Sequence, residues 1–237
     1  MVDQEVELIE HLSELRKRII TTLCAFLFIL IFSFVFVQDI YQWLSREWEG
    51  KLTILGPSDI LWIYFMIAGV IALTFTIPIS AYQIWKFVQP ALTVQERKVT
   101  LAYIPALFIL FLLGISFGYF LVFPVVLTFL TALSAEHFET MFTAEKYFSF
   151  MFNLTVPFGL LFEIPLITMF LTTLGVIDPY KLVKYRKIAY FLLIVLSVLI
   201  TPPDFISDIL VIIPLLLLFE LSVTLSRIVY KRKSKST

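Results

Sequence analysis

Long stretches without charged residues constrain this chain more than any other feature of its sequence. Four of them run over Ile19–Val37, Ile60–Trp85, Val99–Ala135 and Tyr147–Ile177, the last interrupted only by Glu163. A transmembrane α-helix needs about 20 mostly apolar residues. The chain is also 60% hydrophobic, with a mean hydropathy of +0.96, more than a soluble domain of 237 residues is able to bury. We therefore predict an all-α polytopic membrane protein.

The lengths of the apolar runs set the limits of the expected spans. Val99–Ala135 has 37 residues, more than one crossing uses, and Pro124 is expected to divide it. The last two runs, Ile188–Ile200 and Ile209–Phe219, have only 13 and 11 residues. They predict two short helices, the second capped by Asp204, with one broken re-entrant hairpin as the alternative. The expected spans cover residues 19–37, 60–85, 99–123, 147–174, 188–200 and 205–226 of a single membrane domain, 1–237.

Lysine and arginine are distributed unevenly between the segments that connect these spans. Fifteen of the 18 lie in the alternate segments that include both termini. Because basic residues are enriched on the cytoplasmic side, both termini are predicted to be cytoplasmic, with six spans. Prolines within the spans, such as Pro78 and Pro157, fit either a curved arrangement of helices or a bundle whose bends pack together.

Two acids are expected near membrane level on the cytoplasmic face. Glu14 precedes Arg18 by four residues, which is the spacing of a helical salt bridge. Glu96 by itself is typical of an acid near a helix N-terminus, where the helix dipole favours it. Alternatively, the two carboxylates together bind a cationic ligand, arginine especially, because guanidinium pairs bidentately with carboxylate.

Glu163 lies alone at membrane depth. A charge at the bilayer centre costs about 2.5–3.5 kcal/mol on insertion scales, so an acid there marks a functional site by default. One hypothesis is a proton-coupled secondary transporter that uses Glu163, although the chain lacks the internal repeat common in such proteins. A structural hydrogen bond to a Thr or Ser of a neighbouring helix is another.

The residues that commonly carry catalysis or bind metals are sparse. His11 and His137 both lie outside the apolar runs, and Cys24 is the only cysteine. The sequence therefore predicts no buried metal set and no Ser/His pair, so neither an enzyme activity nor a cofactor is expected.

Several motifs, in order along nearly the whole chain, resemble one family. They are His11-Leu12-Ser13-Glu14-Leu15-Arg16-Lys17-Arg18, Tyr82-Gln83-Ile84-Trp85-Lys86-Phe87-Val88-Gln89-Pro90-Ala91-Leu92 followed by Glu96-Arg97, Phe117-Gly118-Tyr119-Phe120 with Phe123-Pro124, Phe158-Gly159, Phe162-Glu163-Ile164-Pro165, Thr201-Pro202-Pro203-Asp204, and Ile213-Pro214 with Phe219-Glu220. Together they resemble TatC, the multispanning subunit of the twin-arginine protein translocase. That family exports folded proteins across the bacterial cytoplasmic membrane using the proton-motive force.

This resemblance implies a fold, a site and partners. The fold would be six transmembrane helices in a concave, glove-like arrangement, with the last two short, in the bacterial cytoplasmic (inner) membrane. Glu14 and Glu96 would bind the arginines of a signal peptide, Arg16 and Phe87 would support that site, and Glu163 would be an intramembrane polar site on the concave wall. Expected partners are twin-arginine signal peptides, TatA-like and TatB-like single-span proteins, the lipid bilayer and further copies of the chain. Neither nucleic acid nor metal is expected.

Overall fold

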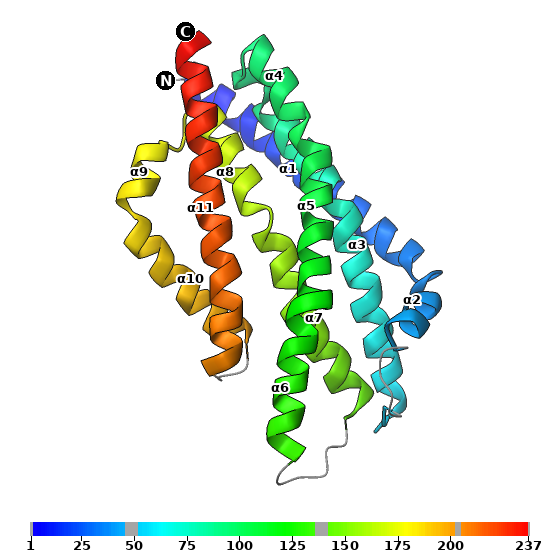
Figure 1. The fold of residues 1–237 in the computed structure, drawn as a ribbon. Helices are drawn as coiled ribbons and strands as arrows, with labels where there is room; N and C mark the ends of the chain where they lie inside the picture. Colours follow the sequence, from blue (N-terminus) through cyan, green and yellow to red (C-terminus); the bar gives the residue numbers. More distant parts are fainter. Residues whose placement is uncertain (1, 46–51, 136–141, 202–204, 237) are drawn as a thin grey trace. The chain divides into compact units, whose positions relative to one another are not determined.

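The computed structural model describes residues 2–45, 52–135, 142–201 and 205–236, and over these ranges it is helical without a strand. The elements are α1 (Val2–Ser33), α2 (Val37–Leu44), α3 (Pro57–Val88), η2 (Gln89–Ala91), α4 (Val94–Leu101), α5 (Tyr103–Phe117), the π-helical turn η3 (Gly118–Val122), α6 (Phe123–Ala135), α7 (Ala144–Leu161), α8 (Ile164–Thr173), α9 (Pro179–Lys184), α10 (Arg186–Ile200) and α11 (Phe205–Ser236) (Figure 1). They divide into two units, Met1–Lys51 with Leu61–Phe108 and Leu52–Ile60 with Ile109–Thr237.

Within the described ranges, four helical stretches are long and apolar enough to cross a membrane: Pro57–Ala91, Val94–Leu133, Ala144–Thr173 and Asp208–Lys231. A fifth is counted if His11–Ser33 and Val37–Leu44, which meet at 70°, make one span. The all-helical membrane fold is thus confirmed, and the count of six remains a prediction. The last helix, expected to be short, has 32 residues, whereas α10 has 15. The expected cap Asp204 lies outside the described residues.

The first helix ends four residues before the predicted limit at Val37. The Ser33 hydroxyl donates to the Ile29 carbonyl at 2.7 Å. The next three amides, from Phe34 to Phe36, each bond to a carbonyl three residues back. This tighter pattern closes α1 and turns the chain into α2.

Two prolines have different effects on their helices. Pro124 was expected to divide its apolar run after Phe123. A new element, α6, does begin at Phe123, but the helical stretch Val94–Leu133 continues across the proline. The turn Gly118–Val122 precedes Pro124 and widens the helix where the proline lacks an amide and crowds the preceding turn. Pro165 instead follows a break, because residues 162 and 163 form a turn between α7 and α8.

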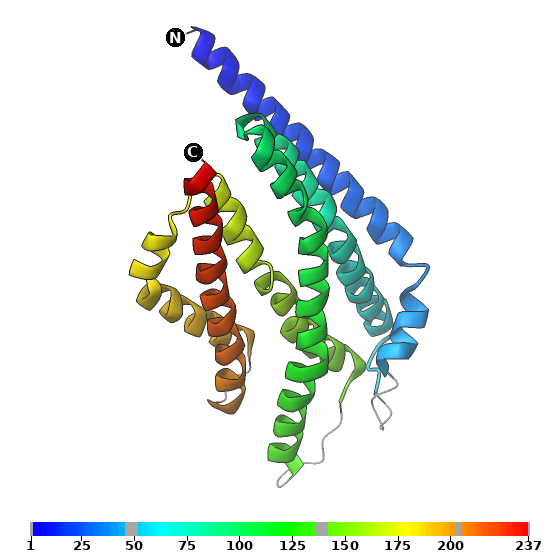
Figure 2. The same ribbon diagram turned by 45° about the horizontal axis from the view of Figure 1, so that its top comes forward.

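In the first unit, α1 lies along α3 (Figure 2). The rings of Phe34 and Phe65 meet edge to face, with their centroids 5.0 Å apart. At the other end of α3, the buried Trp85 Nε1–H donates to the Thr100 hydroxyl of α4 at 2.9 Å. This bond links the end of α3 to α4 across the connecting segment.

In the second unit, α7 packs closely on α5 and η3. A Cβ atom at Gly114 would lie 2.4 Å from the Phe158 carbonyl oxygen, and one at Gly118 would lie 2.9 Å from the Thr155 Cα. Elsewhere in this unit, the hydroxyls of Thr172 in α8 and Ser226 in α11 are 2.6 Å apart. These contacts bring the helix backbones together through small residues, as is common between membrane helices.

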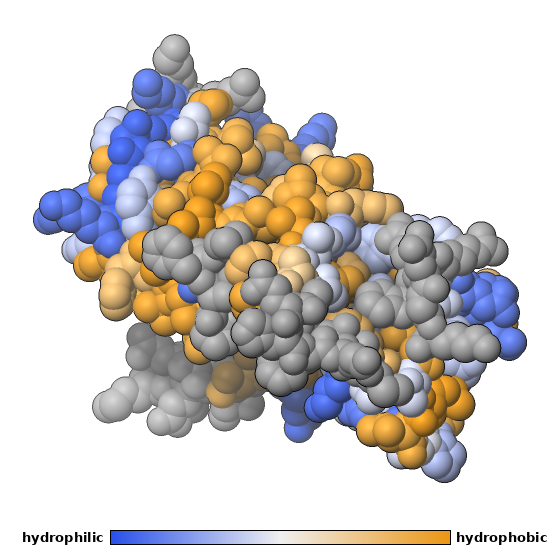
Figure 3. All heavy atoms as spheres, turned by 60° about the horizontal axis from the view of Figure 1, so that its bottom comes forward, coloured by the Kyte–Doolittle hydropathy of each residue, from blue (hydrophilic) through white to orange (hydrophobic). Residues whose placement is uncertain are grey.

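Large apolar side chains cover much of the surface that Figure 3 shows. Both units expose large apolar side chains: Phe28 and Ile31 of α1 are exposed by 72% and 73%, and Leu199 of α10 by 76%. A water-soluble monomer rarely exposes so much apolar area. Contact with lipid explains this surface.

Candidate functional site

Glu14 lies on α1, where Arg18, one turn further on, holds its carboxylate. Arg18 Nη2 is 2.5 Å from Glu14 Oε1, and Arg18 Nη1 donates to Gln83 Oε1 of α3 at 3.3 Å. The expected helical salt bridge is confirmed, and it extends to a second helix. The hydrogen bond from Arg18 holds the pKa of the Glu14 carboxyl below its usual value. Glu14 is therefore ionised at neutral pH and attracts cations.

Glu96 is fixed at the start of α4 by a reciprocal cap with Thr93. Its Oε2 accepts from the Thr93 amide at 2.9 Å and from the Thr93 hydroxyl at 2.8 Å. The Glu96 amide lies 3.3 Å from Thr93 Oγ1. The expectation of an acid at a helix N-terminus is confirmed, in the form of a capping box. The half-buried carboxylate is thereby held in one place.

The first two sequence motifs meet between α1 and α3. The His11 and Phe87 rings have their centroids 4.5 Å apart, and Arg16 is exposed on α1. The structure therefore brings Phe87 to the helix that carries Glu14. It places Glu96 in the same unit, on α4.

A groove of about 510 Å³ lies between α1 and α3, next to the Glu14–Arg18 pair. Arg18 and Gln83 line it together with apolar side chains, namely Leu15, Ile19, Leu23, Phe26, Ile84 and Phe87. Two polar atoms along the groove, Arg18 Nε and Thr76 Oγ1, are buried without a hydrogen-bond partner in the part of the chain that the structure describes. An acidic position thus adjoins an apolar groove that retains some unused polar atoms.

Glu163 belongs to the second unit and occupies the break between α7 and α8. It is only 8% exposed, and its carbonyl accepts from the amides of Leu166 and Ile167 at 3.0 Å. Its Oε1 is buried without a partner among the described residues. The nearby Thr168 hydroxyl donates to the Ile164 carbonyl instead. The hypothesis of a structural hydrogen bond from a neighbouring helix therefore finds no support at this oxygen.

The sequence and the fold of this chain both match known proteins. A family model described as Sec-independent protein translocase protein (TatC) matches residues 10–214. The chain belongs to the TatC family. It is 65% identical to TatCd of Bacillus subtilis (strain 168) over 235 residues, which cover 99% of this chain and 97% of the relative. It is 41% identical to TatCy of the same organism, with 98% and 93% covered.

A crystal structure of the twin-arginine translocase receptor TatC matches this fold with a TM-score of 0.79 and 32% identity, covering 92% of this chain and 99% of the other. TatC-family membership confirms the resemblance seen in the sequence motifs. It makes the chain a subunit of a protein translocase and assigns it to protein export. This assignment favours export over the transporter hypothesis for Glu163.

Sequence reasoning missed two features of this TatC-family site. The capping box was visible as Thr93 followed three residues later by Glu96, before an apolar run. The groove between α1 and α3 had no such signal, because its apolar residues read as ordinary membrane-facing positions. Among the residues that the structure describes, no group of three His, Cys, Asp or Glu side chains is placed to hold a metal ion.

Proposed function

We propose that this chain is the receptor for twin-arginine signal peptides, with recognition at Glu14 and Glu96. The bond between Arg18 and Glu14 carries the proposal, because it places a guanidinium on this carboxylate at 2.5 Å. A peptide arginine has the same chemistry and replaces Arg18 on Glu14, while the second arginine pairs with Glu96. Arg16 and Phe87 support the site from α1 and α3.

The groove between α1 and α3 receives the apolar part of the signal peptide in this proposal. Its apolar wall begins beside Arg18, so a peptide anchored on Glu14 enters the groove directly. The free energy of binding then combines charge pairing with burial of apolar surface.

The chain lies in the bacterial cytoplasmic membrane with both termini cytoplasmic, as the distribution of Lys and Arg predicts. Six helices in a concave arrangement are too few to enclose a folded protein. Assembly with TatA-like and TatB-like proteins, and with further copies of the chain, builds the passage, and the proton-motive force drives export.

The full chain in lipid nanodiscs is expected to bind a twin-arginine signal peptide about tenfold more tightly than the same peptide with two lysines. Guanidinium pairs with carboxylate through two parallel hydrogen bonds, whereas ammonium acts as a point charge. Fluorescence anisotropy of labelled peptides measures both affinities, and a peptide with two glutamines serves as the control. Equal binding of the arginine and lysine peptides would exclude this recognition mode.

For Glu163 we propose a polar contact with the membrane span of a partner subunit. Its Oε1, which is buried in a break between two helices without a partner among the described residues, supports this role. A buried oxygen without a hydrogen bond is costly in apolar surroundings, and a polar group on a partner's helix relieves that cost.

Glu163→Leu is expected to abolish export and yet to stabilise the folded chain by about 1–3 kcal/mol, because it removes a buried oxygen that has no partner in the described ranges. Glu163→Gln keeps a polar side chain and should retain part of the export. Thr155→Val is the matched control, since Thr155 Oγ1 is also buried without a described partner. It should add stability and leave export unchanged. Thermal unfolding and export of a reporter in cells measure the two effects, and full export by Glu163→Leu contradicts the role.

A further inference from the structure

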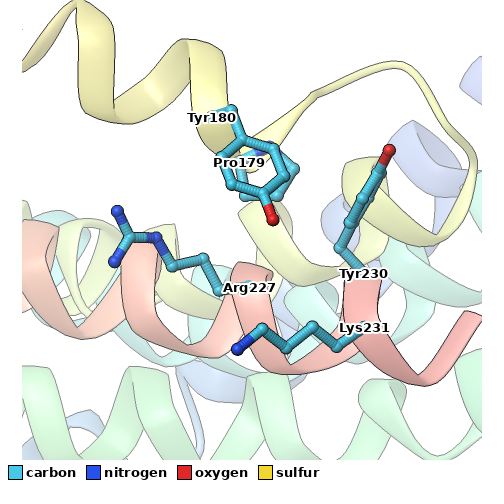
Figure 4. Close-up of a pocket in the computed structure, with 5 residues that line it drawn as sticks. All are labelled: Pro179, Tyr180, Arg227, Tyr230 and Lys231. Atoms are coloured by element: carbon cyan, nitrogen blue, oxygen red, sulfur yellow. The ribbon is translucent and has the colours of Figure 1, made fainter. Parts of the chain in front are cut away.

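A small cavity between α9 and α11 lies outside the sites described above. It has a volume of about 250 Å³ and is lined by Pro179 and Tyr180 of α9 and by Arg227, Tyr230 and Lys231 of α11 (Figure 4). Pockets for organic ligands usually measure roughly 300–1,000 Å³. The volume of this cavity is therefore enough for one small polar group of a ligand. The remainder of that ligand would lie outside the cavity.

The two cations of this cavity are not neutralised by the described part of the chain. Arg227 and Lys231 are four residues apart on α11, and neither forms an ion pair within the described ranges. Arg227 Nε is buried there without a hydrogen-bond partner. The neighbouring acid, Asp178, instead accepts from the Tyr180 amide at 2.8 Å and caps α9. Unused donors on two cations favour an anionic ligand.

Two tyrosines complete the lining of the cavity. The Tyr180 and Tyr230 rings are perpendicular, with their centroids 5.8 Å apart. The Tyr180 hydroxyl points toward α11 (Figure 4). Tyrosine is enriched at membrane–water interfaces, where its ring is apolar and its hydroxyl is polar. Arg227 is also the first residue after the predicted last span, 205–226. The cavity is therefore expected at the depth of lipid headgroups.

An apolar face of α11 leads up to the cavity. Leu217, Leu221 and Ile228 are exposed by 66%, 51% and 44%. Thr224 is exposed between them, and its hydroxyl is bonded to the Glu220 carbonyl of the same helix at 2.8 Å. The spacing of the three apolar residues, four and seven positions, puts them on one side of the helix, and Lys231 follows three residues later on the same side. A lipid tail along this face would have its headgroup at Lys231. An inorganic phosphate ion has no acyl chain and would make no apolar contact with this face.

We propose that this cavity binds the phosphate of an anionic phospholipid. Arg227 and Lys231 pair with the phosphate oxygens, and the Tyr180 hydroxyl donates to the headgroup. The acyl chains lie along Leu217, Leu221 and Ile228. Basic pockets between helices on the cytoplasmic side of a membrane bind lipid headgroups through the same chemistry. The bound lipid fixes α9 against α11 at the membrane surface.

The test measures lipid binding to the purified full chain by native mass spectrometry during titration with phosphatidylglycerol. In the variant carrying Arg227→Gln and Lys231→Gln, the Kd for this lipid is expected to rise about tenfold. The matched control carries Lys184→Gln and Lys187→Gln, which remove the same charge from exposed positions outside the cavity. The control should keep the wild-type Kd. Equal losses in both variants, or no loss in either, would overturn the proposal.

Two further titrations identify the source of the phosphate. Zwitterionic phosphatidylcholine is expected to bind the wild-type chain weakly, and millimolar inorganic phosphate should not displace phosphatidylglycerol. Displacement by inorganic phosphate at those concentrations would make the cavity a site for the free ion and overturn the lipid assignment. Equal affinity for phosphatidylcholine would show that the two cations do not select an anionic lipid.

Discussion

Replacing both Glu14 and Glu96 by glutamine is expected to weaken binding of a twin-arginine signal peptide by about tenfold or more and to stop export. The change removes two negative charges and leaves the shapes of the side chains almost unaltered. Glutamine still accepts a hydrogen bond from Arg18 at position 14, and it is a normal partner of Thr93 in the capping box at position 96. The fold should therefore survive, and the loss should report recognition alone.

Titration of a labelled peptide at increasing salt checks this result. Wild-type affinity should fall with ionic strength, because Glu14 and Glu96 are both partly exposed and salt screens that exposed part of the charge pairing. The affinity of the double variant should change little. Glu145→Gln, in the first turn of α7, serves as the matched control and should behave as wild type. Unchanged peptide affinity in the double variant would remove Glu14 and Glu96 from the site.

Gly114→Ala is expected to destabilise the chain by about 2–4 kcal/mol and to reduce the amount of folded protein in the membrane. The added Cβ would lie 2.4 Å from the Phe158 carbonyl oxygen and 2.8 Å from the Gly159 Cα. Both are backbone atoms of α7, so no side-chain rotation relieves the overlap. The helices must move apart, and the close contact between α5 and α7 is lost.

Gly69→Ala is the matched control, because a Cβ there meets nothing within 4 Å. It lies inside α3, where alanine is favoured over glycine by roughly 0.5–1 kcal/mol. Thermal unfolding in detergent, followed by size-exclusion chromatography, compares the two variants. A Gly114→Ala protein as stable as Gly69→Ala would show that α5 and α7 tolerate a wider separation.

Much of the fold was predictable from the sequence because the bilayer imposes a local rule. Every backbone polar group in lipid must be hydrogen-bonded, and a helix meets this requirement within one segment, so a long apolar run becomes a helix wherever it lies. The limits were less predictable: Pro124 does not break its run, and α1 ends at Ser33. The continuation past Pro124 and the end of α1 both depend on which backbone carbonyls lack a hydrogen bond within the helix. The pattern of apolar residues does not specify those carbonyls. The spacing Gly114-Ile115-Ser116-Phe117-Gly118 did signal a close helix contact, and it was missed.

The sequence by itself determined the membrane class, the helical segments, the family and the residues proposed for the site. These follow from composition, from the length of apolar runs and from motifs, which are properties of short segments. Only the tertiary structure decided that Arg18 bridges Glu14 and Gln83, that a groove lies beside them, and that Glu163 Oε1 is buried without a partner in the described chain. Each of these depends on side chains from different helices or turns, and their positions are set by packing rather than by local sequence.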